Sequence, residues 1–150
     1  MHAELRELLG GDGLLTAAED VAPFLVDHRR LYQGRALGVA LPRTVTQVSA
    51  LLAWCNIRGI GVVPHGGNTG YCGGATPDES GRQLVVALRR LDRVRTLDAA
   101  NFSITVEAGC LLADVQRTAA EAGRFYPVSL GSEGSCQIGG NLSTNAGGLN

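Results

Sequence analysis

Lysine is absent from this sequence of 150 residues, because all 13 basic residues are arginine. The absence excludes a Walker phosphate-binding loop, a pyridoxal Schiff base and a lysine nucleophile. The 14 acidic residues bring the net charge to −1, which indicates no polyanion-binding surface, so nucleic acid is not an expected partner. Long apolar runs are missing too, so the sequence predicts neither an export signal nor a transmembrane segment.

Closely paired cysteines are also missing. Cys55, Cys72, Cys110 and Cys136 are separated by 17, 38 and 26 residues. This spacing excludes a zinc knuckle and a redox dithiol, so we expect a cytoplasmic protein with reduced thiols and no metal site. A composition of 45% apolar and 18% charged residues is typical of one globular domain. Because the sequence stops after a glycine-rich stretch, we expect it to be part of a longer protein.

The apolar pattern predicts a mixed α+β fold. Helices are expected at residues 3–9, shortly after Leu14, at 44–58 and at 111–123, and strands at 36–41, 60–63, 84–88 and 102–109. The helix at Thr44 has the strongest signals, since Gln47 completes a capping box and Gly59 provides a left-handed stop. Its buried face is expected to carry Val45, Val48, Leu51, Leu52 and Cys55.

Glycine is abundant, with 21 residues, and much of it lies in two segments. The first, PHGGNTGYCGG at residues 64–74, follows a predicted strand but precedes no helix, and it lacks the G-x-G-x-x-G spacing of a Rossmann fold. Successive glycine N–H groups can instead surround a phosphate without a lysine. A plain surface loop remains the alternative.

The second segment, residues 131–148, has six glycines and a single charged residue, Glu133. Solvent-exposed loops usually carry more charge. An uncharged, donor-rich segment with small side chains can lie against a large planar cofactor. Together the two segments predict a dinucleotide held mainly by backbone dipoles, and the alternative for the second is a disordered tail.

Three motifs in order, VVPHGGNTGYCGG, ITVEAG and GSCQIGGNLSTNAGG, resemble the FAD-binding domain of the FAD-linked oxidase superfamily, also called vanillyl-alcohol-oxidase or PCMH-type. The likeness runs from about residue 34 to 148 and is greatest to the D-lactate, D-2-hydroxyglutarate and glycolate-oxidase-type dehydrogenases. It implies an α+β, PCMH-type domain of mixed small sheets flanked by helices, not a Rossmann fold. Residues 1–150 would be its N-terminal part, with the rest of the domain and the substrate domain beyond this chain.

The resemblance implies cofactor-binding residues in both segments. Around the FAD pyrophosphate it places Pro64, His65, Gly66, Gly67, Asn68, Thr69 and Gly70, with Gly73 and Gly74 completing the turn. Along the flavin and its phosphates it places Ser135, Ile138, Gly139, Gly140, Asn141, Thr144, Asn145, Gly147 and Gly148, preceded by Pro127 and Leu130. It identifies no catalytic residue and no metal ligand within this chain.

Several side chains near these segments have more than one interpretation. Many relatives with covalent flavin carry His directly after the glycine pair, where this sequence has Asn68, so we expect non-covalent FAD. His65 either touches a phosphate or is a solvated loop residue. Cys72 and Cys136 are expected to pack as small apolar side chains.

Charged residues near the third predicted strand carry a weaker signal. Arg89, Arg90, Arg93 and Arg95 could form an anion site, although a solvated basic turn is the favoured interpretation. Glu107 is expected to anchor the adjacent glycine turn through hydrogen bonds rather than to act in catalysis.

The reaction implied by the resemblance is oxidation of a small 2-hydroxy acid, with hydride transfer to FAD. The base and the clamp for the substrate carboxylate would lie in the absent domain, so this chain alone is expected to be inactive. Two alternatives remain open. One is another oxidoreductase on the same FAD fold, of the alditol oxidase or cell-wall precursor reductase type, and the other is a non-catalytic nucleotide-binding module. The substrate, the electron acceptor and the oligomeric state are not predicted.

Overall fold

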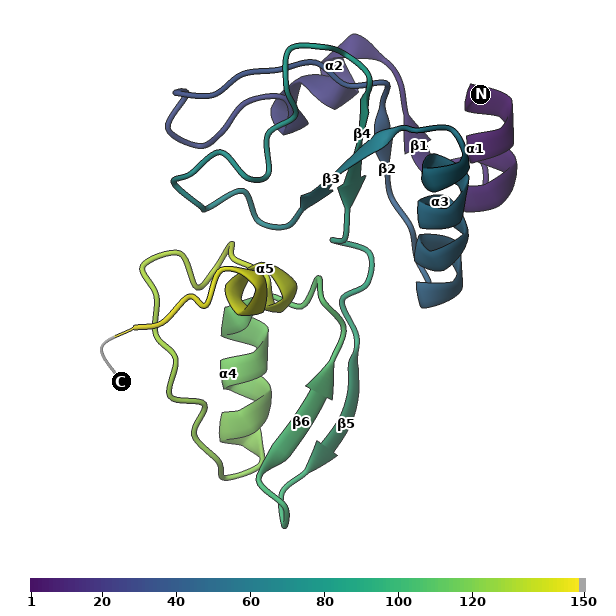
Figure 1. Cartoon of the computed structure of the whole chain (residues 1–150). Coiled ribbons are helices and arrows are strands. Elements are labelled where there is room, and N and C mark those ends of the chain that lie inside the picture. The colour runs from purple at the N-terminus through teal and green to yellow at the C-terminus, as the bar shows by residue number, and fades with distance from the viewer. Residues whose placement is uncertain (149–150) are drawn as a thin grey trace.

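The computed structural model describes residues 1–148, which fold into two lobes (Figure 1). The first lobe, residues 1–88, contains a four-stranded sheet, and the second, residues 93–148, contains a two-stranded sheet with two helices. These small sheets flanked by helices confirm the predicted α+β class. None of the helices within residues 1–148 is long and apolar enough to cross a bilayer.

The first lobe is built on a mixed sheet with the strand order β1-β2-β4-β3. Its elements are α1 (His2–Leu9), β1 (Leu14–Leu15), α2 (Ala18–Val21), the 3₁₀ helix η1 (Ala22–Phe24), β2 (Val39–Ala40), α3 (Val45–Ile57), β3 (Gly61–His65) and β4 (Gln83–Ala87). Strands β2, β4 and β3 are parallel, so the carboxyl ends of β3 and β4 lie at the same edge. The glycine-rich segment 66–74 begins at that edge.

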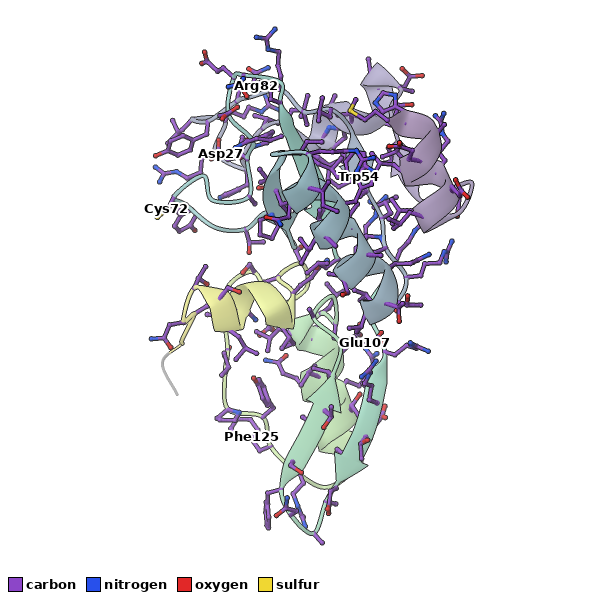
Figure 2. The ribbon with its side chains drawn as sticks, turned by 45° about the vertical axis from the view of Figure 1, so that its right-hand side comes forward. Asp27, Trp54, Cys72, Arg82, Glu107 and Phe125 are labelled. Atoms are coloured by element: carbon purple, nitrogen blue, oxygen red, sulfur yellow. The ribbon has the colours of Figure 1, made fainter. Side chains whose placement is uncertain are left out.

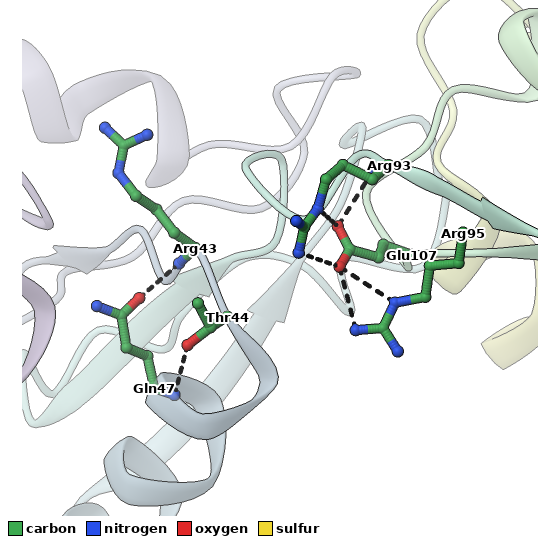
Figure 3. A network of polar contacts seen from close by, with 6 residues as sticks. All are labelled: Arg43, Thr44, Gln47, Arg93, Arg95 and Glu107. Carbon is green, nitrogen blue, oxygen red and sulfur yellow. Dashed lines mark hydrogen bonds and ion pairs between the residues drawn. The ribbon is translucent and has the colours of Figure 1, made fainter.

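Helix α3 confirms the predicted capping signals. The Thr44 hydroxyl accepts a hydrogen bond from the Gln47 N–H at 3.1 Å, and the Gln47 side chain accepts one from the Arg43 N–H at 2.7 Å (Figure 3). Gly59 has the predicted left-handed conformation, with φ of 62°. These contacts fix where the helix begins and where the chain leaves it.

The prediction of which α3 side chains are buried is partly wrong. Leu51 and Cys55 are buried as expected, but Val45 and Leu52 are exposed and Val48 is only half-buried. The reason is that α3 also packs against α1, so its contact face turns toward Trp54. The same cluster includes Leu5, Leu9, Leu14, Ala40, Leu84 and Val86.

The second lobe has its own small core. Its elements are β5 (Val94–Asp98), β6 (Ser103–Val106), α4 (Leu112–Glu121) and α5 (Ile138–Ser143). Leu112 and Val115 of α4 pack with Cys110, Cys136 and Ile138. The predicted helix at 111–123 is confirmed as α4, with Leu112, Val115 and Ala119 buried and Ala122 half-buried.

Two predictions about this lobe are wrong. Residues 89–95 are not wholly a turn, because β5 begins at Val94, and every residue of β5 is exposed, which removes the apolar alternation that signals a strand. Residues 131–148 are not one irregular segment, because α5 lies within them. Its Gly139–Gly140 pair has low helix propensity, so the sequence does not indicate a helix there.

Glu107 fixes the start of the second lobe, where the chain enters β5. Its buried carboxylate accepts hydrogen bonds from the N–H of Arg93 at 3.1 Å and from its guanidinium at 3.0 Å, and it pairs with Arg95 at 3.3 Å (Figure 3). The hydrogen bonds from Arg93 hold the pKa of Glu107 below its usual range. Glu107 does form hydrogen bonds, as expected, but its carboxylate binds Arg93 and Arg95 rather than the adjacent glycine turn, so the predicted partner is wrong. Arg93 and Arg95 are ion-paired rather than merely solvated.

Replacing Glu107 with Gln is expected to lower the melting temperature of the chain at neutral pH. It should also make the melting temperature depend less on pH in the acidic range. Because its pKa is depressed in the folded chain, the Glu107 carboxylate stabilises the fold above the pKa it has when unfolded, and this stability is lost as pH falls through the folded pKa. Circular dichroism melts from neutral pH down to about pH 3 would measure both effects. Glu79→Gln is the control, since Glu79 is exposed, and an equal loss in both variants would contradict the role of Glu107.

Candidate cofactor-binding site

The structure brings the two glycine-rich segments into direct contact. A Cβ atom on Gly67 would overlap the carbonyl oxygen of Ser135, and a Cβ atom on Gly66 would lie 3.5 Å from the Gln137 side-chain oxygen. Figure 1 shows α5 directly below the loop that follows β3. The two segments, separated by more than fifty residues in the sequence, therefore form one surface at the junction of the lobes.

The backbone amides of the first segment are available to a ligand. The carbonyl oxygen of His65 still accepts a hydrogen bond from the Leu88 N–H at 3.1 Å. Beyond it, in the part of the chain that the structure describes, no backbone N–H of residues 66–74 donates to another backbone carbonyl group. A run of unpaired N–H groups in a turn can bind an anion through their dipoles. This segment therefore has the donor set that a pyrophosphate needs.

Three glycines at this surface have open space beside the backbone. At Gly70, Gly74 and Gly140 a Cβ atom would meet no atom of the described residues within 4 Å, and none of the three has a positive φ. Neither backbone conformation nor packing within residues 1–148 therefore explains why these positions are glycine. At these positions a bound molecule could approach the backbone closely.

The second segment contributes fewer free donors than expected. The N–H groups of Ile138 and Gly139 donate to Cys110 and Ala108 at 2.9 and 2.8 Å. The Thr144 hydroxyl donates to the Gly140 carbonyl at 2.8 Å. The expectation of a segment rich in free donors is therefore only partly met, because α5 and its contacts with the loop before α4 use many of these groups.

His65 is buried rather than solvated, so one of its two predicted interpretations is wrong. Its side chain is 7% exposed, and its ring centroid lies 4.9 Å from that of Phe24. Burial lowers the pKa of His65, and the nearby Arg89 charge acts in the same direction. Within residues 1–148, His65 Nε2 and the buried Gln137 Oε1 have no hydrogen-bond partner. Buried polar atoms in proteins usually have a partner, so a water molecule or a ligand group could bind these two atoms.

The other predicted residues divide between the surface and the core. Pro64, Ser135, Asn145 and Gly147 are exposed at or near the junction, while Thr69 and Gly73 are half-buried. The Ile138 side chain is buried in the core of the second lobe, and Leu130 packs against that core. Their side chains therefore do not face the site.

Several predicted residues make contacts within the protein. The Asn68 Nδ2 donates to the Val26 carbonyl at 2.9 Å, and the Asn141 Nδ2 lies 3.5 Å from the Cys136 Sγ. A Cβ atom on Gly148 would overlap the Ser129 carbonyl oxygen, and Pro127 lies exposed in the same connection. Cys136 is buried as predicted, but Cys72 is exposed, so the packing role predicted for Cys72 is wrong.

Known proteins are similar to this chain in sequence and in fold. The model of the family described as FAD binding domain matches residues 36–150. The probable D-2-hydroxyglutarate dehydrogenase, mitochondrial, of Oryza sativa subsp. indica is 38% identical over 96% of this chain. The D-2-hydroxyglutarate dehydrogenase of Xanthomonas citri pv. viticola is 40% identical over 91% of it. The chain spans 25% and 28% of the lengths of these two relatives.

Solved structures show the same fold at lower sequence identity. Alkyldihydroxyacetonephosphate synthase superposes on 98% of this chain with a TM-score of 0.88 at 18% identity, and the chain covers 28% of that protein. Substrate-bound p-cresol methylhydroxylase superposes on 93% with a TM-score of 0.78 at 21% identity, and the chain again covers 28%. The match to the family model covers most of the residues, and the expected PCMH-type fold is present. The chain therefore belongs to the FAD-binding domain family of FAD-linked oxidoreductases.

Proposed function

We propose that this chain supplies part of the FAD site of a dehydrogenase that oxidises a small 2-hydroxy acid, and that the FAD is bound non-covalently. The observation that carries the proposal is the contact between the two glycine-rich segments, which leaves unpaired amides beside open glycine backbone. The names of the relatives, D-2-hydroxyglutarate dehydrogenases, support the 2-hydroxy acid as the substrate class.

The residues at the junction fit a dinucleotide cofactor. The amides of residues 66–70 would hold the pyrophosphate, with Gly73 and Gly74 in the same turn. The exposed backbone of Gly140 and the side chains of Ser135 and Thr144 would lie along the rest of the cofactor. The site needs no lysine, because backbone dipoles supply the positive potential.

FAD, when bound, supplies an acceptor for the two electrons that leave a 2-hydroxy acid as it becomes a 2-oxo acid. This chain binds and orients the cofactor, and the segments packed at Gly67 and Ser135 cover part of the site. We assign no proton-transferring group to residues 1–148, because the acidic and histidine side chains described at the junction are ion-paired or buried.

The non-covalent mode of binding is supported by Asn68. A carboxamide is not a nucleophile, and the Asn68 Nδ2 already donates to the Val26 carbonyl. The nucleophile to test is Cys72, whose thiol is exposed in the same segment. Thiols attack as thiolates and can form covalent bonds to cofactors.

The absorption spectrum of the purified 150-residue chain, mixed with FAD and desalted, tests this proposal. We expect flavin absorbance to remain with the protein after desalting and to pass into the supernatant when the protein is precipitated with acid. The Cys72→Ser variant should behave in the same way. Flavin in the acid precipitate of the unmodified chain would contradict non-covalent binding, and failure to bind FAD in excess would contradict the assigned site.

A further inference from the structure

We infer that Asp27 is a positioning residue for the cofactor site. It fixes the shape of a loop in the first lobe, residues 26–33, and that loop holds the glycine-rich segment 66–74 in a conformation with its amides unpaired. This role rests on the proposed function, because it concerns how the chain prepares that site for FAD.

Asp27 is buried at the centre of the 26–33 loop. Its side chain is 2% exposed, and its Oδ1 accepts hydrogen bonds from the N–H groups of Leu31 and Tyr32, each at 2.7 Å. Its Oδ2 accepts a third hydrogen bond, from Arg29 N–H at 3.0 Å. These N–H groups hold the pKa of Asp27 below its usual range, with the Tyr32 N–H contributing most. A carboxylate is the side chain that can accept all three bonds.

The backbone of Asp27 closes the same loop. Its N–H donates to the Tyr32 carbonyl at 3.0 Å, and its own carbonyl accepts from Arg30 N–H at 2.9 Å. Arg30 has a left-handed φ of 58°, which a bulky residue adopts only where its surroundings require it. Five hydrogen bonds on one residue therefore determine the path of the chain from residue 27 to 32.

The 26–33 loop contacts the glycine-rich segment at three places. Near the start of that segment, the Val26 carbonyl accepts the Asn68 side chain at 2.9 Å. At its middle, the His28 ring lies 5.5 Å from the Tyr71 ring. At its end, the Tyr32 ring occupies the space beside Gly73, where a Cβ atom would lie 2.7 Å from the ring. Figure 2 shows Asp27 and Cys72 on neighbouring loops of the first lobe.

These contacts matter because the glycine-rich segment does not hold its own shape. In the described chain its N–H groups make no bonds to backbone carbonyls, so its order must come from neighbouring segments. A binding loop that is already ordered avoids the entropy cost of ordering when the ligand binds. Without Asp27 the 26–33 loop would lose its fixed conformation. FAD would then have to order the amides of residues 66–74 as it binds, and this entropy cost would weaken FAD binding.

Asp27→Ala, Asp27→Asn and Asp98→Ala test this role in the 150-residue chain. Asp27→Asn keeps one acceptor oxygen for the N–H groups of Leu31 and Tyr32 and loses the acceptor for Arg29. Asp98 is the matched control, because its Oδ1 accepts the Asn101 N–H at 2.9 Å in the turn between β5 and β6, away from the site. We expect FAD binding to weaken about 10- to 100-fold in Asp27→Ala, the range seen when groups that orient metal ligands are removed. The loss of FAD affinity should be smaller in Asp27→Asn. Asp98→Ala should bind FAD as tightly as the unmodified chain.

Amide resonances of chains labelled with ¹⁵N-glycine give a readout that does not depend on FAD. The resonances of Gly66, Gly70 and Gly74 should shift in Asp27→Ala and stay in place in Asp98→Ala. Asn68→Ala should cost little further FAD affinity once Asp27 is replaced, because both act on the same segment. If Asp27→Ala lowers the melting temperature but leaves both the glycine resonances and FAD affinity unchanged, the positioning role is wrong. If the unmodified chain does not bind FAD, the proposed function fails, while the resonances still decide whether Asp27 orders the segment.

Discussion

Gly67→Ala is expected to abolish FAD retention and to lower the melting temperature of the cofactor-free chain. A Cβ atom at this position would overlap the Ser135 carbonyl oxygen and lie 2.8 Å from the Ser135 carbonyl carbon and 3.0 Å from the Cys136 Cα. All three are backbone atoms, so no side-chain rotation relieves the overlap. Overpacking typically costs about 1–3 kcal/mol even where side chains can adjust. The two glycine-rich segments must therefore move apart, and the surface that they form together is lost.

Gly66→Ala is the matched control for this prediction. Its Cβ atom would approach the Gln137 side-chain oxygen at 3.5 Å, an ordinary contact, and its N–H group would be unchanged. Quenching of flavin fluorescence would give FAD affinity, and thermal melts followed through the Trp54 signal would give stability. We expect Gly66→Ala to stay close to the unmodified chain in melting temperature and to lose less FAD affinity than Gly67→Ala. Equal losses in the two variants would show that the segments do not depend on the contact at Gly67.

The sequence predicted the parts of the fold in which local signals agree with tertiary packing. At α3, the cap at Thr44 and the stop at Gly59 are local features, and both appear in the structure. The strand pattern at 84–88 corresponds to β4, whose residues from Leu84 to Ala87 are buried. The contact between the two glycine-rich segments also agrees with the sequence, because glycine at Gly67 is what lets one backbone lie against the other.

What the sequence did not predict depends on contacts between distant residues. Strand β5 is exposed along its whole length and is defined only by pairing with β6. Helix α5 contains two adjacent glycines and is fixed by bonds from Ile138 and Gly139 to the loop before α4. Asp27 was not singled out because it lies in an irregular stretch, and its importance comes from ordering its own loop, whose Val26 contacts a segment that follows about forty residues later. Asp residues do favour such turns, and this preference is the signal that could have identified it.

Gly140→Val is expected to separate FAD binding from stability. Gly140 lies within α5, is exposed, and has no described atom within 4 Å of the point where a Cβ atom would lie. Glycine is less favourable in a helix than other residues except proline, by up to about 1 kcal/mol relative to alanine. Valine should therefore leave the melting temperature unchanged or raise it. If the cofactor lies against this backbone, the same side chain occupies its space, and FAD affinity should fall about tenfold or more.

Gly11→Val is the control that makes the comparison decisive. Gly11 is also exposed, with no described atom within 4 Å of a Cβ and no positive φ, but it lies between α1 and β1, outside the site. Its replacement should leave FAD affinity unchanged. Destabilisation alone would lower both stability and binding, so weaker FAD binding in a chain that melts no earlier indicates a direct clash with the cofactor. FAD binding by Gly140→Val at the affinity of the unmodified chain would instead mean that the cofactor does not approach α5.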